Sequence, residues 1–175
     1  MQDILAKAAR IQLVIFDVDG VLTDGSLYLD DDGREIKAFH SRDGHGMKML
    51  RQAGVSMAVI TGRQSELVSI RMGNLGVDYL YQGQEDKRRA FEDLLGKTGL
   101  DPSQVAYVGD DVIDLPVMIR VGLAIAVQDA HPLVKKHAHW ITPTVGGRGA
   151  ARDVAERILE AHGVLDAVLN PYLER

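Results

Sequence analysis

The chain has 175 residues, and its 25 acidic and 20 basic side chains give a net charge of −5. This length suits one compact domain with a hydrophobic core, and no basic run would follow a nucleic-acid backbone, so nucleic acid is not an expected partner. Cysteine is absent, which excludes disulfides, thiolate metal ligands and thiol nucleophiles.

The N-terminal segment lacks the features of an export signal. Residues 1–10 are polar and have no apolar signal-peptide core, and no apolar stretch in the sequence approaches the length of a transmembrane helix. We therefore expect a soluble protein in the cytoplasm, with residues 1–175 forming a single domain and no membrane partner.

Short apolar segments alternate with amphipathic segments along the chain. The apolar segments are bounded by turn residues and are expected to form strands: Gln12–Phe16, Met57–Ile60, Tyr79–Tyr81, Val105–Val108, Leu123–Val127 and Trp140–Ile141. Apolar residues at spacings of three and four predict helices between them: Gly46–Ala53, Ser65–Leu75, Glu85–Leu95, Val112–Arg120, Pro132–His137 and Arg148–His162. This order predicts an α/β fold, a Rossmann-like parallel sheet with helices on both faces.

Two segments depart from the alternation. Ser26–Asp30 and Glu35–His40 flank Asp31-Asp32-Gly33, which predicts a β-hairpin inserted after the first strand. Residues 164–175 form an apolar-dotted C-terminal tail that Asn170-Pro171 interrupts. We expect this tail to dock, either on its own domain or near the active site of a neighbouring subunit.

The residues that can carry chemistry follow the predicted strands directly. In an open parallel sheet, ligands bind at the carboxyl ends of the strands, so side chains in these positions are expected to share one edge. They are Asp17 and Asp19 after the first strand, Thr61, Gly62 and Arg63 after the second, Lys87 after the third, and Asp110, Asp111 and Asp114 after the fourth.

Carboxylates crowded at one edge repel one another unless a cation neutralises them. Oxygen ligands without imidazole or thiolate suit Mg²⁺. A metal between Asp17 and Asp110 would also bind a phosphoryl oxygen, while Thr61 and Lys87 would offset charge on the others. Each residue alone has a plainer explanation as a turn, helix cap or surface residue, but their joint occurrence at strand ends predicts phosphoryl transfer.

The same residues resemble the motifs of the haloacid dehalogenase superfamily. Asp17-Val18-Asp19-Gly20-Val21-Leu22-Thr23-Asp24 resembles its first motif, and Thr61, Lys87 and the segment Gly109–Asp114 resemble the others in order. The resemblance implies that Asp17 attacks phosphorus to form an aspartyl phosphate, and that Asp19 protonates the leaving alkoxide and then activates water. It also implies a metal held by the Asp17 carboxylate, the Asp19 carbonyl and Asp110, supported by Asp111 and Asp114.

The gaps between the motifs leave no room for a cap domain, so a neighbouring subunit is expected to shield the site from water. The chain resembles the capless 3-deoxy-D-manno-octulosonate 8-phosphate phosphatases, which are tetramers, in Phe39, Arg42, Asp43, Gly44, Gly46 and Lys48, in Arg63 and Arg71, and in Gly146–Asp153. The resemblance implies an acidic sugar phosphate substrate in lipopolysaccharide precursor synthesis. It implies substrate contacts from Asp19, His40, Ser41, Arg42, Asp43, Gly44, Lys48, Gly62, Arg63, Arg71 and Lys87, with Arg71 reaching an adjacent subunit's site.

Three alternative functions stay open. Relatives that act on nine-carbon keto sugar acids tend to have Glu at the position of Arg63 and Lys at that of Asn74, and this chain has neither. A receiver domain of signalling proteins carries similar residues in a different order. A non-catalytic oligomerisation module is disfavoured by the intact set of Asp17, Asp19 and the other motif residues.

His137-Ala138-His139 could bind a metal, but this spacing often just directs two polar side chains outward.

Overall fold

The fold is a parallel sheet between two layers of helices. The computed structural model describes residues 2–174, and its main sheet has six strands in the order β5-β4-β1-β6-β7-β8, all paired in parallel. The strands are β1 (Leu13–Phe16), β4 (Ser56–Ile60), β5 (Tyr79–Tyr81), β6 (Val105–Gly109), β7 (Leu123–Ala126) and β8 (Trp140–Ile141). The predicted Rossmann-like α/β fold is confirmed, and the described residues contain no cap domain.

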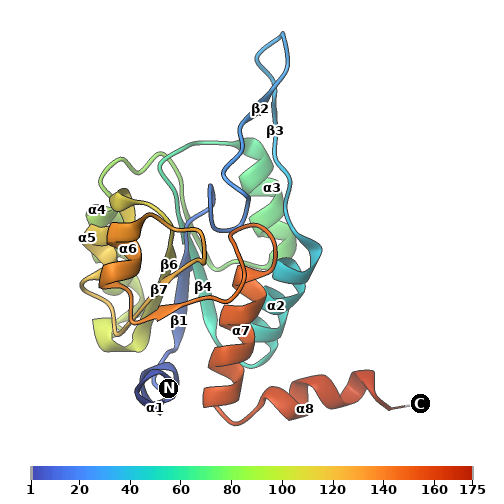
Figure 1. Ribbon diagram of the computed structural model, residues 1–175, viewed down its shortest axis with the longest axis vertical. Coiled ribbons are helices and arrows are strands. Elements are labelled where there is room, and N and C mark those ends of the chain that lie inside the picture. Colours follow the sequence, from blue (N-terminus) through green and yellow to red (C-terminus); the bar gives the residue numbers. More distant parts are fainter. Residues whose placement is uncertain (1, 175) are drawn as a thin grey trace.

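Helices cover both faces of the sheet (Figure 1). One face carries α1 (Gln2–Ala8), α2 (Ser41–Gln52), α3 (Glu66–Leu75) and α7 (Ala150–Ala161), and the other carries α4 (Lys87–Thr98), α5 (Leu115–Met118) and α6 (Pro132–His137). Short 3₁₀ turns occur at η1 (Pro102–Gln104) and η2 (Val112–Asp114). Among residues 2–174, none of the helices combines the length and apolar character that crossing a membrane requires.

The central strands are buried from end to end because helices cover both of their faces. All residues of β1, β6 and β7 are buried, which explains why these strands are continuous apolar runs in the sequence and not alternating ones. This packing fixes the position of β1, and with it the loop that follows β1.

The helices differ from the prediction in several places, and α4 ends at Thr98 and not at Leu95. Helix α2 begins at Ser41 and not at Gly46, because the Asp43 carboxylate accepts the N–H groups of Gly149 and Arg152 and so fixes the first turn against α7. The predicted helix Val112–Arg120 is divided into η2 and α5. Pro116 is the second residue of α5 and has no N–H to donate to the Val112 carbonyl, as a continuous α-helix would require. Helix α1 was not predicted at all; its Ala8 packs in the core.

The predicted hairpin is present and projects from the domain (Figure 1). Its strands β2 (Tyr28–Leu29) and β3 (Glu35–Ile36) pair antiparallel and are shorter than expected. Four large apolar side chains of the hairpin are between 48% and 63% exposed: Leu27, Tyr28, Leu29 and Ile36. The hairpin therefore presents an apolar surface that its own domain does not cover.

The C-terminal tail forms a short helix, α8 (Leu165–Leu169), followed by the turn η3 (Asn170–Tyr172). In Figure 1 it extends away from the sheet beyond the end of α7. The Tyr172 ring packs edge-on against His45 of α2, with 5.5 Å between centroids, while Leu173 is exposed. The tail thus contacts its own domain without burying any of the residues of α8 or η3.

Candidate active site

Asp17 lies directly after β1, in the middle of the sheet, and its carboxylate is held from two sides. The Val18 N–H donates to Asp17 Oδ1 at 2.7 Å, and Lys87 Nζ lies 2.9 Å from Asp17 Oδ2. Burial and the nearby charge of Asp114 raise the pKa of Asp17 to about 6, although Lys87 and the Val18 N–H act in the opposite direction. The site therefore presents one fixed carboxylate at the carboxyl edge of the sheet.

A cavity of about 180 Å³ opens at this edge, beside Asp17. The residues that line it come from the loops after β1, β4 and β6: Asp17, Asp19, Thr61, Gly62, Arg63, Asp110, Asp111 and Ile113. The loops that were expected to meet at one edge of the sheet do so. Ile113 was not predicted as a site residue, and it adds an apolar wall to an otherwise polar cavity.

Lys87 and Asp114 form a buried hub behind the cavity. Lys87 Nζ lies 2.7 Å from Asp114 Oδ1, and the Tyr107 hydroxyl donates to the same oxygen at 2.7 Å. The second oxygen of Asp114 accepts the N–H groups of Asp110 and Asp111 at 3.0 and 3.2 Å. Burial by itself would lower the pKa of Lys87, but the charges of Asp17 and Asp114 raise it above the usual value. Lys87 therefore stays an ammonium.

Tyr107 is a site residue that the sequence did not reveal, because it lies inside a buried strand among apolar neighbours. It is fully buried in β6, and burial with the charge of Asp114 raises its pKa well above the usual value. Its hydroxyl also accepts from Lys87 Nζ at 3.2 Å. Tyr107 therefore stays a neutral donor that fixes the Asp114 carboxylate and, through it, Lys87.

The carboxylates of Asp17, Asp110 and Asp114 lie close enough to hold one cation, with one oxygen of each within 4.8 Å of the others. Asp110 Oδ1 is buried and has no hydrogen-bond partner among the described residues. Burial and the charges of Asp114, Asp17 and Asp111 raise the pKa of Asp110 to about 8. An orphaned carboxylate oxygen beside a second carboxylate fits a hard divalent cation such as Mg²⁺.

Asp114 is the poorest ligand of this set, because its two oxygens already accept four hydrogen bonds. The Asp17 carboxylate has only two such contacts, and Asp110 Oδ1 has none among the described residues. Gly20 helps to place Asp110. Its φ of +90° favours glycine, and a Cβ at this position would overlap the Asp110 carboxylate. The loop after β1 and the loop after β6 therefore fit together only because residue 20 has no side chain.

Asp19 contacts the base of the hairpin, which the sequence did not predict. Its Oδ1 pairs with Lys37 Nζ at 2.5 Å, and its Oδ2 lies 3.7 Å from Arg63 Nε. Glu35 joins the cluster through Lys37 and Arg63. The available signal was the spacing of Glu35 and Lys37, because residues two apart on a strand point to the same side.

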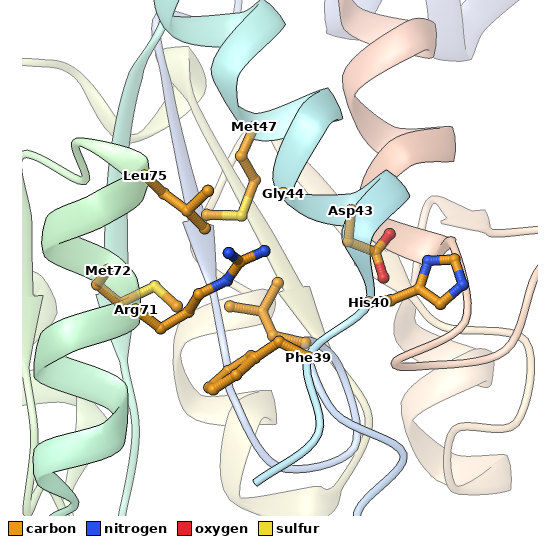
Figure 2. A pocket seen from close by; sticks show the side chains of 9 residues that line it. Phe39, His40, Asp43, Gly44, Met47, Arg71, Met72 and Leu75 are labelled. Carbon is orange, nitrogen blue, oxygen red and sulfur yellow. The ribbon is translucent and has the colours of Figure 1, made fainter.

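Several of the predicted substrate-binding residues surround a different and smaller pocket, between α2 and α3 (Figure 2). Its volume of about 10 Å³ leaves room for about one water molecule. The Arg71 guanidinium lies 5.8 Å from the centre of the Phe39 ring, in a space where a Cβ on Gly44 would overlap it. Figure 2 shows His40 and Asp43 on the other side of Gly44 from Arg71.

The structure thus separates the predicted substrate-binding residues into groups. Asp19, Gly62 and Arg63 line the cavity beside Asp17, and Lys87 lies behind it. His40, Asp43, Gly44 and Arg71 line the second pocket. Ser41, Arg42 and Lys48 are exposed on α2. Within one chain, therefore, the residues of α2 and Arg71 do not line the cavity beside Asp17.

The glycine-rich loop before α7 closes over the loop after β1. The Gly147 N–H donates to the Val21 carbonyl at 2.8 Å, and Arg148 Nη2 lies 2.9 Å from Asp24 Oδ2. A Cβ on Gly146 would overlap the Gly20 carbonyl oxygen. The two loops pack backbone against backbone, which holds the segment that carries Asp17 and Asp19.

Gly146→Ala is therefore expected to destabilise the protein and to slow catalysis together. Because a methyl group at residue 146 must displace the backbone of Gly20, we expect a loss of about 1–3 kcal/mol, or roughly 2–10 °C in Tm. Thermal unfolding and steady-state kinetics measure the two effects.

Gly96→Ala is the matched control, because residue 96 lies in α4 and no atom lies within 4 Å of its added Cβ. This variant should gain about 0.5–1 kcal/mol and keep full activity. Equal stability of the Gly146→Ala variant and the parent would show that the two loops have room to separate.

Comparison with known proteins gives one consistent family. Residues 80–152 match the model of the haloacid dehalogenase-like hydrolase family. The 3-deoxy-D-manno-octulosonate 8-phosphate phosphatase KdsC of Escherichia coli strain K12 is 51% identical over 164 residues, which are 94% of this chain and 87% of that protein.

Solved structures agree with this result. The 3-deoxy-D-manno-octulosonate 8-phosphate phosphatase of Yersinia pestis is 49% identical, with a TM-score of 0.93 over 94% of this chain and 89% of that one. The phosphatase of the same name from Moraxella catarrhalis, solved with magnesium, phosphate and KDO, is 40% identical, with a TM-score of 0.96 over 98% of this chain and 99% of that one.

Proposed function

The chain belongs to the 3-deoxy-D-manno-octulosonate 8-phosphate phosphatase family of haloacid dehalogenase-like hydrolases, and on this basis we propose that it hydrolyses that sugar phosphate to the free sugar acid and phosphate. It is a magnesium-dependent phosphoric monoester hydrolase of lipopolysaccharide precursor synthesis. The observation that carries the proposal is the cavity that Asp17, Asp19, Thr61 and Asp110 share, with Lys87 held behind it. We also propose that the protein acts in the cytoplasm.

The chemistry runs in two steps that use the same pair of aspartates. The Asp17 carboxylate forms a bond to phosphorus while the bond to the sugar oxygen breaks, and Asp19 gives its proton to the leaving alkoxide. Water then attacks the aspartyl phosphate, Asp19 takes up the proton, and Asp17 is released unchanged. Asp17 is already fixed for this attack by the Val18 N–H and Lys87.

Charge balance in the cavity comes from a metal and from cationic or polar groups. The Asp17 and Asp110 carboxylates and the Asp19 backbone carbonyl would hold Mg²⁺, which when bound offsets the charge between the carboxylates and the phosphoryl group. The Thr61 hydroxyl and Lys87 would contact the other phosphoryl oxygens. Asp114 supports this arrangement by fixing Lys87 and the N–H groups of Asp110 and Asp111, and Asp111 caps η2.

Arg63 is the group best placed to recognise the acidic sugar. Its side chain is 47% exposed, lines the cavity and lies beyond Asp19. A guanidinium in this place can pair with the carboxylate of a sugar acid. The remaining predicted contacts, from His40, Ser41, Arg42, Asp43, Gly44, Lys48 and Arg71, are proposed to act at the interface with a neighbouring chain.

Phosphate release from a panel of substrates tests the proposed function. We expect the highest kcat/KM for 3-deoxy-D-manno-octulosonate 8-phosphate, a lower value for a nine-carbon keto sugar acid phosphate, and the lowest for an aryl phosphate that lacks a carboxylate. Arg63→Ala should reduce the difference in kcat/KM between the sugar acid phosphates and the aryl phosphate. A preference for the nine-carbon substrate would instead assign the chain to the alternative specificity.

We propose that the chain, a single domain over residues 1–175 with its tail at 164–175, assembles into a tetramer with active sites at subunit interfaces. The exposed apolar hairpin supports this, because a free antiparallel ribbon can pair with other copies through its edges and side chains.

Replacing Leu29 and Ile36 together by Asp should lower the mass in solution, as measured by light scattering, because charges would then occupy the proposed contact. Ile119→Asp is the matched control. Ile119 is also highly exposed but lies after α5, on the face of the sheet away from α2 and α3. An unchanged mass of the hairpin variant would place the interface elsewhere.

A further inference from the structure

Lys37 has a buried side chain, although its neighbours Ile36 and Ala38 are exposed. It follows β3, where Ile36 is exposed, yet its own side chain is only 2% exposed. Its Nζ lies 2.5 Å from Asp19 Oδ1 and 3.2 Å from Glu35 Oε1. Lysine is rarely buried to this extent without paired carboxylates, so these two contacts account for its position.

Glu35 links this lysine to the loop after β4. Its Oε1 accepts from Arg63 Nη2 at 3.1 Å, and its Oε2 accepts from the Ser65 hydroxyl at 2.8 Å. Although partial burial opposes charging, Ser65, Lys37 and Arg63 lower the pKa of Glu35, which keeps it a carboxylate. The base of the hairpin is thereby joined to two of the three loops that line the cavity, those after β1 and β4.

The contacts of Lys37 are with carboxylates of the protein and not with the cavity. Lys37 is not among the residues that line the space beside Asp17, whereas Asp19 is. Lys37 occupies one oxygen of Asp19, and the other oxygen has only the longer contact to Arg63, at 3.7 Å. The ion pair therefore fixes the rotation of the Asp19 carboxylate and leaves one oxygen free toward the cavity.

We propose that Lys37 is a positioning residue, which aims the free oxygen of Asp19 at the leaving group. The inference rests on the proposed role of Asp19 as the general acid and base. Lys37 itself touches neither the phosphoryl group nor the sugar. The residue acts from the hairpin, so a segment outside the superfamily motifs shapes the proton-transfer step.

The sharpest readout compares two leaving groups. A sugar alkoxide needs a proton as it departs, whereas p-nitrophenolate leaves without one. Lys37→Met is expected to lower kcat for the sugar phosphate by about 10²-fold, with KM nearly unchanged, and to affect the formation of aspartyl phosphate from p-nitrophenyl phosphate far less. Burst kinetics with p-nitrophenyl phosphate isolate that first step. Lys37→Arg, which keeps the charge, should recover part of the loss.

Asp19→Asn completes a double-mutant cycle. If Lys37 acts through Asp19, adding Lys37→Met to Asp19→Asn should cause no further loss with the sugar phosphate. Lys97→Met is the matched control, because Lys97 forms an exposed pair with Asp93 on α4, and it should change neither substrate's rate.

Equal losses with both leaving groups, or a rise in KM alone, would overturn the inference. Additive losses in the cycle would also do so. If Lys37→Met does not fold, Lys37→Gln removes the charge and retains a donor, and the same comparisons apply to it. If Asp19→Asn itself leaves the rate unchanged, the proposed role of Asp19 fails. If Asp19→Asn is slow and Lys37→Met is not, only the role of Lys37 fails.

Discussion

Asp17→Asn is expected to lower kcat by at least about 10⁴-fold, because an amide cannot attack phosphorus and no other carboxylate lies where Asp17 does. The fold should survive. Since burial raises the pKa of Asp17 to about 6, the folded protein holds its proton more tightly than the unfolded chain does. The resulting stabilisation exists at low pH and is lost as the pH rises through about 6. At pH 7.5 without metal, the Asn variant should therefore melt at least as high as the parent.

Steady-state kinetics and thermal unfolding on one preparation of Asp17→Asn test the expected loss of kcat and the expected survival of the fold. Asp93→Asn is the matched control, because this aspartate pairs with Lys97 and Tyr81 on the surface of α4. It should keep full activity. Turnover by purified Asp17→Asn at more than a trace of the parent's rate would remove Asp17 from the role of nucleophile. A large loss of folded protein would show that the carboxylate is needed for structure.

Removal of divalent metal is expected to stop turnover completely, and Mg²⁺ should restore it, because the clustered carboxylates otherwise repel the phosphate. The pH dependence of the stabilisation by Mg²⁺ offers a second measurement. Burial and neighbouring carboxylates raise the pKa of Asp110 to about 8 and that of Asp17 to about 6. The metal-free protein should therefore lose stability as the pH rises from about 4 to above 8.

Mg²⁺ binds the ionised carboxylates, so the rise in Tm that it causes should be larger at pH 8.5 than at pH 5.5. Asp110→Asn should remove most of this rise, whereas Asp93→Asn should keep it. Activity that persists after exhaustive EDTA treatment would contradict the mechanism. A rise in Tm that is the same at both pH values would show that the cation binds somewhere other than between Asp17 and Asp110.

The sequence predicted those site residues that directly follow a strand of the main sheet. Asp17, Thr61 and Asp110 each follow an apolar run, and parallel strands bring their carboxyl ends to one edge, so their meeting could be predicted from local patterns. The same reasoning predicted all six strands of the main sheet, because β-strand runs and turn residues are local signals.

Residues that reach the site from other directions could not be found in this way. Lys37 meets Asp19 only because the hairpin folds back, and Tyr107 donates to Asp114 from the middle of the buried strand β6. The start of α2 depends on Asp43, whose partners Gly149 and Arg152 are more than a hundred residues away in sequence. Such contacts have no periodicity, so only the folded chain reveals them. Pro116, in contrast, was a visible signal that the helix at Val112–Arg120 would be interrupted.

The packing of the loop at Gly146 against Gly20 has a consequence for how the chain folds. β1 pairs with β6, and Arg148 pairs with Asp24 across 124 positions of sequence. The loop that carries Asp17 therefore depends on partners that are synthesised last. Contacts of such high sequence separation form slowly, because a long loop must close before they contribute. A nascent chain that ends before Gly146 would contain Asp17, but it would lack the loop that packs against the segment carrying Asp17. Catalytic competence is thus a late event of folding, reached only when both ends of the domain have met.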